Sequence, residues 1–122
     1  MENRETIITG NHLVLTESLK TYVEQKTAKL IRHEPRIIRV RVELEYDQTR
    51  SRQEQFRARG IIEIHGPDLV ASESGEEMYR VIELMTGKLD RMLRNRSRHI
   101  RAKRARPHAV ELSASIPKAE DP

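Results

Sequence analysis

The chain has 122 residues, the size of a single domain, and its 23 basic and 19 acidic side chains give a formal net charge of +4. It contains no cysteine, which excludes disulfides and thiolate metal sites. No apolar run approaches the ~18 residues that a membrane span needs, and the amino-terminal residues lack a signal peptide's apolar region, so we expect a cytoplasmic protein without a membrane partner.

The first third of the chain predicts a strand followed by a helix. Residues 6–9 are a β-branched run that ends at the turn signal Gly10-Asn11. A helix is expected over residues 17–31, capped by Thr16 and ended by Pro35. Its apolar face comprises Leu15, Leu19, Tyr22, Val23, Leu30 and Ile31.

Two lysines lie on or beside the apolar stripe of this helix. Lys26 falls inside the stripe and Lys29 lies at its edge. Either both side chains extend past the core rim into water, or the edge of the stripe is a contact surface that needs cations. Both interpretations remain open at this point.

The middle of the chain predicts a hairpin of two alternating strands, over residues 37–46 and 56–64, joined by a polar loop over residues 47–54. The buried face of the first strand is expected to carry Ile38, Val40, Val42, Leu44 and Tyr46. Pairing Tyr46 with Phe56 places Glu45 opposite Arg57, Glu43 opposite Arg59 and Arg39 opposite Glu63. A slip by two residues would place Arg41 opposite Arg59, so cross-strand charge favours the first register.

The last part of the chain predicts a short strand over residues 69–72 and a long helix over residues 74–106. Ser74 is the expected N-cap, with Glu77 completing a capping box. The helix has an apolar face comprising Met78, Val81, Ile82, Met85, Leu89, Met92 and Leu93.

The second half of this helix is strongly cationic. From Lys88 to Arg106 there are nine basic residues and one acid, which gives +8 within a chain of +4. The simpler interpretation is a solvated helix end, where cations are favourable. However, the thirteen residues from Arg94 to Arg106 contain seven basic residues and no acid, which indicates an arm that binds a polyanion.

The order of elements predicts an α+β fold. It is a two-layer β-α-β-β-β-α arrangement, a four-stranded sheet with both helices packed on one face and strands one and two parallel. The opposite face of the sheet is expected to be charged and solvated. Residues 1–106 form the predicted domain, and residues 107–122, which lose the periodicity, are expected to be a disordered tail.

Nothing in the sequence indicates catalysis. The five histidines are far apart and not at metal-ligand spacing, and no phosphate-cradling glycine loop or nucleophile elbow is present. We therefore expect no enzymatic activity, no metal and no cofactor.

Two motifs resemble one known family. The first motif, near the start of the chain, comprises residues 8–11, 15–19, 22–23, Lys26 and 29–30. The second motif, in the last part of the domain, comprises residues 71–79, Ile82 and 88–93. They resemble the ribosome hibernation-promoting factors, also called ribosome-associated inhibitors or sigma-54 modulation proteins, over about residues 5–100. The match is to the short form, which lacks the long form's dimerisation domain. The resemblance implies a domain similar to a double-stranded-RNA-binding domain with an extra first strand.

The resemblance also implies a function and a set of contact residues. Family members bind the small ribosomal subunit in the messenger and transfer-RNA channel, inhibit translation and protect idle ribosomes in starvation or stationary phase, in some cases with another hibernation factor. No DNA partner is implied. The rRNA contacts carried over by position are Lys26, Lys29, Lys88 and Arg91, and the basic run continues through Arg94, Arg96, Arg98 and Arg101. Here the run from Arg101 to Arg106 is more basic than the family pattern, and the loop over 47–54 is longer than in the shortest members.

Two alternatives remain. The chain could be a protein-binding regulator of transcription, as the family's older name suggests, and a salt-insensitive contact with a polymerase subunit would favour it. It could also be a generic structured-RNA-binding module, which would bind free duplexes as tightly as ribosomes. Because aromatic residues make up only 3% of the chain, base stacking is expected to be minor.

Overall fold

The computed structural model describes residues 5–105, with side chains described over residues 6–98. Residues up to Arg91 form one compact unit, and the residues from Met92 onward belong to a second. The predicted tail over residues 107–122 lies outside the described residues. Among the described helices, none is long and apolar enough to cross a membrane.

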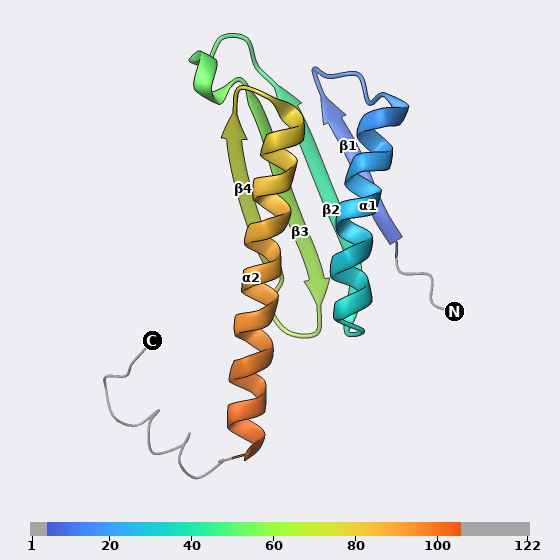
Figure 1. Ribbon diagram of the computed structural model, residues 1–122, viewed down its shortest axis with the longest axis vertical. Coiled ribbons are helices and arrows are strands. Elements are labelled where there is room, and N and C mark those ends of the chain that lie inside the picture. Colours follow the sequence, from blue (N-terminus) through green and yellow to red (C-terminus); the bar gives the residue numbers. More distant parts are fainter. Residues whose placement is uncertain (1–4, 106–122) are drawn as a thin grey trace. The chain divides into compact units, whose positions relative to one another are not determined.

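The first unit is a four-stranded sheet with two helices on one face. The strands β1 (Glu5–Asn11), β2 (Ile37–Tyr46), β3 (Phe56–Ile64) and β4 (Leu69–Gly75) lie in sequence order, with β1 parallel to β2 and the other pairs antiparallel. Helix α1 (Glu17–His33) and the part of α2 (Met78–Ala105) that belongs to this unit cover the same face and run in the same direction (Figure 1). The predicted α+β architecture is confirmed.

The hairpin has the register that cross-strand charge predicts. Glu45 lies opposite Arg57, Glu43 opposite Arg59 and Arg39 opposite Glu63, as predicted. The prediction was wrong at the start of β2, where the register shifts between Ile37 and Arg39. This irregularity buries Ile37 and leaves Ile38, expected in the core, 49% exposed.

The helix-covered face of the sheet holds the core. Val40, Val42 and Leu44 of β2 are fully buried, as are Met85 and Leu89 of α2. The helix approaches β3 at Gly60, where an added Cβ would lie 2.5 Å from Met85 Sδ and 2.7 Å from Leu89 Cδ1. A side chain here would displace the ends of Met85 and Leu89, so glycine allows the close approach of the helix and is not needed for an unusual backbone angle.

The opposite face of the sheet is not uniformly solvated, which corrects the prediction. Ile61 lies on this face between Arg41 of β2 and Val70 of β4, yet only 4% of its surface is exposed. Arg41 and Arg39 both reach Glu63, at 3.0 and 2.9 Å. The aliphatic stems of long side chains can cover an apolar neighbour while their charged ends stay in water.

The two helices begin in different ways. The Oγ1 of Thr16 accepts a hydrogen bond from the backbone N–H of Leu19 at 3.1 Å, which confirms the predicted cap of α1. The expected cap of α2 was wrong, because Ser74 belongs to β4, which continues to Gly75 and pairs Ser74 with Arg57. Glu77 precedes the helix instead, and its carboxylate accepts from the backbone N–H of Arg80 at 3.2 Å.

Candidate nucleic-acid interface

Two cations of α1, Lys26 and Lys29, lie on the flank of Tyr22, which faces α2. Lys26 is half-buried, and its Nζ lies 5.4 Å from the centroid of the Tyr22 ring. This distance is within the range of a cation–π contact. Lys29, three residues further along α1, is exposed. Lys26 is therefore held on an aromatic surface, while Lys29 presents its charge to solvent.

Lys88 does not project freely, because a carboxylate and a carbonyl oxygen contact its ammonium group. Its Nζ lies 2.9 Å from Glu73 Oε2 and donates a hydrogen bond to the carbonyl oxygen of Ser72 at 3.3 Å. Both partners are on β4. The helix surface beside β4 thus carries a lysine whose charge is already partly offset.

The remaining candidates follow along α2. Arg91 is exposed and is the last residue of the first unit. In the second unit Arg94 and Arg98 are exposed, Arg96 is half-buried, and the Arg98 guanidinium donates to Asn95 Oδ1 at 2.5 Å. Arg101 lies within the helix, but its side chain is outside the described residues.

Helical geometry divides the predicted set between two surfaces. Tyr79 and Lys88 are nine residues apart, which places them on opposite flanks of α2 at 100° per residue. Tyr79 contacts Tyr22 of α1, so its flank faces α1, whereas Lys88 faces β4. Lys29 lies near the carboxyl-terminal end of α1, and Arg91 ends the part of α2 that belongs to the first unit. The two helices run in the same direction (Figure 1).

The open face of the sheet carries several arginines, and three of them, Arg39, Arg41 and Arg59, have acidic partners. Arg59 Nη1 lies 3.5 Å from Glu43 Oε1, and Glu63 receives both Arg39 and Arg41. Such exposed pairs contribute little stability, about 0–1 kcal/mol each, but they neutralise this face locally. The helix side is therefore the better candidate surface for a polyanion.

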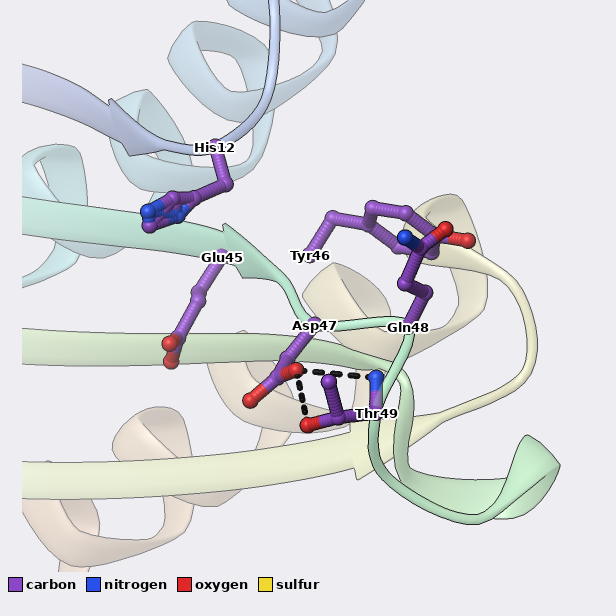
Figure 2. Close-up of a pocket in the computed structure, with 6 residues that line it drawn as sticks. All are labelled: His12, Glu45, Tyr46, Asp47, Gln48 and Thr49. Atoms are coloured by element: carbon purple, nitrogen blue, oxygen red, sulfur yellow. Dashed lines mark hydrogen bonds between the residues drawn. The ribbon is translucent and has the colours of Figure 1, made fainter.

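A pocket of about 510 Å³ lies beside the loop that follows β2, and Figure 2 shows the residues that line it, among them His12, Glu45 and Asp47. The Thr49 hydroxyl donates to Asp47 Oδ1 at 2.6 Å and the Thr49 backbone N–H donates to the same oxygen at 3.0 Å. These hydrogen bonds hold the pKa of Asp47 below its usual value, so the carboxylate is ionised at neutral pH. A pocket with two carboxylates is unsuited to phosphate.

Sequence reasoning missed the aromatic contact between the helices. The rings of Tyr22 and Tyr79 lie 5.1 Å apart between centroids, at an interplanar angle of 80°. The feature of the sequence that could have indicated this contact was the position of Tyr22 in the apolar stripe of α1, one turn before Lys26. Within the described residues, no group of three or more acidic or histidine side chains could hold a metal ion.

Comparison with known proteins agrees with this architecture. Residues 6–101 match the family described as sigma 54 modulation protein / S30EA ribosomal protein. The ribosome hibernation promoting factor of Azotobacter vinelandii is 35% identical over 86 residues, 70% of this chain and 76% of that protein. The Escherichia coli K12 protein of the same name is 33% identical over 86 residues, covering 70% and 85%.

Solved structures show the same fold at low sequence identity. A ribosomal subunit interface protein from Coxiella burnetii superposes with a TM-score of 0.67 at 15% identity, over 76% of this chain and 97% of that one. The amino-terminal domain of Thermus thermophilus Protein Y gives 0.64 at 21% identity, over 77% and 98%. Together with the match over residues 6–101, these relationships establish that the chain belongs to the sigma 54 modulation protein / S30EA ribosomal protein family.

Proposed function

We propose that this protein is a cytoplasmic ribosome hibernation factor that inhibits translation and protects idle ribosomes under starvation or in stationary phase. It binds the small ribosomal subunit in the channel that messenger and transfer RNA otherwise occupy. It acts by occupying this channel, so it catalyses no reaction. Similarity to relatives named ribosome hibernation promoting factor supports the role in hibernation.

The observation that supports RNA binding is that the two faces of the first unit differ in how their cations are paired. On the sheet face, three arginines have glutamate partners within 3.5 Å. On the helix face, Lys29 and Arg91 are exposed. A polyanion gains affinity from cations that can release its counterions, and exposed cations supply this without first breaking an internal ion pair.

The proposed rRNA contacts are eight of the lysines and arginines of the two helices. Lys29 and Arg91 bind phosphates directly, Lys26 binds from the surface of Tyr22, and Lys88 binds after exchanging Glu73 for a phosphate. The run in the second unit extends the contact along α2 through Arg94, Arg96, Arg98 and Arg101.

Charge reversal tests this surface. The variant with Lys29→Glu and Arg91→Glu is compared with a control carrying Arg52→Glu and Arg57→Glu, which changes the net charge equally at exposed positions of the loop and the open sheet face. Both variants should stay folded, because exposed substitutions usually cost within about 0.5 kcal/mol. Binding to purified small ribosomal subunits is measured by sedimentation at several salt concentrations.

We expect the helix variant to lose most of its binding and its salt dependence to flatten by about one unit of slope per lost phosphate contact. The control variant should bind nearly as the wild type does. Equal binding by both variants would refute the helix surface as the RNA-binding face. Failure of the wild-type chain to bind small subunits would refute the proposed function itself.

A further inference from the structure

The junction between the two helices contains a pocket whose chemistry differs from that of the phosphate-binding cations. It has a volume of about 370 Å³ and is lined by Glu17, Ser18, Thr21, Tyr22, Gln25 and Tyr79. This volume is at the lower end of the range of about 300–1,000 Å³ for small-molecule sites. All six residues belong to the first unit. We propose that this pocket binds a single unpaired nucleobase of RNA, stacked on Tyr79.

The charges around the pocket favour a base over a phosphate. The residues that line it include one carboxylate, Glu17, and no cation. A phosphate group would find no cation in the lining, because the carboxylate of Glu17 is only partly offset by Lys20 Nζ at 3.7 Å, whereas a neutral base can donate its ring or amino N–H groups to that carboxylate. The hydroxyl of Thr21 and the amide of Gln25 supply further donors and acceptors of the kind that base edges require.

The two aromatic rings have different roles. Lys26 Nζ lies 5.4 Å from the centroid of the Tyr22 ring and packs against it. Tyr79 packs edge-to-face against Tyr22 and remains 37% exposed, so it is the ring that can receive a base. An aromatic side chain provides a stacking surface for any base.

Lys26 connects this pocket to the cationic surface. It lies four residues beyond Tyr22, one turn along α1 and outside the pocket lining. A nucleotide whose base lies on Tyr79 can therefore place its phosphate toward Lys26. This inference rests on the proposed function. It adds recognition of a base to a surface that otherwise contacts only the RNA backbone.

The first test compares three substitutions of tyrosine in binding to small ribosomal subunits. Tyr79→Leu removes the aromatic ring, Tyr79→Phe keeps it, and Tyr46→Leu is a matched control at the other aromatic pair, where Tyr46 packs 4.9 Å from Phe56. We expect Tyr79→Leu to bind about tenfold more weakly, with an unchanged salt slope because no phosphate contact is lost. Tyr79→Phe and Tyr46→Leu should bind as the wild type does, with circular dichroism and thermal unfolding verifying that each variant is folded.

The second test detects the base directly. The chain has three tyrosines and no tryptophan, so its intrinsic emission comes from tyrosine. A short single-stranded RNA should quench this emission, and an abasic strand with the same number of phosphates should not. Tyr79→Leu should abolish the difference between the two strands.

The outcomes separate this inference from the function on which it rests. If the wild-type chain binds small subunits but Tyr79→Leu binds equally well, the base pocket is refuted and the proposed function stands. Equal quenching by the abasic strand would also refute the pocket. A wild-type chain that does not bind small subunits refutes both.

Discussion

Lys88 on α2 is ion-paired with Glu73 on β4, with 2.9 Å between Nζ and Oε2. Both side chains are partly exposed, so the pair is worth about 0.2–1 kcal/mol. A phosphate that binds Lys88 has to replace this carboxylate. Glu73 therefore sets part of the free-energy cost of using Lys88 as an RNA contact.

The substitution Glu73→Gln should strengthen binding to small subunits by up to about fivefold, because Lys88 no longer gives up an ion pair. Glu43→Gln is the control, since it removes the same charge from the open face, where Glu43 pairs with Arg59. Binding isotherms at low salt measure both. If Glu73→Gln weakens binding, Glu73 instead holds Lys88 in its binding position.

Gly60 and Gly87 should respond in opposite ways to the same substitution. Gly60→Ala forces a methyl group against Met85 and Leu89 and should destabilise the fold by about 1–3 kcal/mol. Gly87→Ala lies within α2, where the added Cβ has only Arg91 Nη1 nearby at 4.0 Å, and should stabilise by about 0.5–1 kcal/mol. Urea unfolding measures the change in the free energy of unfolding for both variants. A Gly60→Ala variant as stable as the wild type would contradict the close contact between β3 and α2.

Met85→Ala should lower the free energy of unfolding by roughly 2–5 kcal/mol, because the side chain is fully buried and leaves a cavity. Leu84→Ala, one residue earlier on the exposed side of α2, should cost much less. Thermal unfolding compares the two variants. Similar losses at both positions would mean that the packed face of the helix has been assigned wrongly.

Thr49→Val should raise the pKa of Asp47 toward its usual value, because the hydroxyl bond is the largest cause that lowers it. A carboxyl whose pKa is lowered in the folded state stabilises that state above its unfolded pKa, and this stabilisation is lost as pH falls through the folded pKa. The variant should therefore lose less stability on acidification than the wild type. An NMR titration of the Asp47 carboxyl measures the pKa, and Thr49→Ser should keep it low.

The sequence predicted those parts of the fold that local pattern and pairing charge determine. Strict alternation located β2 and β3, and the opposite charges of Glu45 and Arg57 and of Glu43 and Arg59 predicted the register that the structure shows. Ile38 was misplaced because the irregularity at the start of β2 reverses the alternation without a glycine or proline to mark it. Ser74 was misplaced because pairing with Arg57 of β3 extends β4 over residues that are also good helix caps.

The candidate site was predictable in composition but not in arrangement. A helical wheel locates Lys88 outside the apolar stripe, but it does not include β4, which supplies Glu73. In the same way, Tyr22 and Tyr79 are 57 residues apart in the chain, and only the packing of α1 beside α2 brings their rings together. Contacts between elements depend on tertiary packing, which periodicity does not encode.

The shared direction of α1 and α2 has a kinetic consequence. Acids stand at the amino-terminal ends of both helices, at Glu17 and Glu77, and exposed cations stand further along, at Lys29 and Arg91. The first unit therefore carries a side-chain charge gradient along the helices, which gives it an orienting torque in the field of a polyanion. It should approach with its cationic end leading, so that ionic strength changes the association rate more than the dissociation rate.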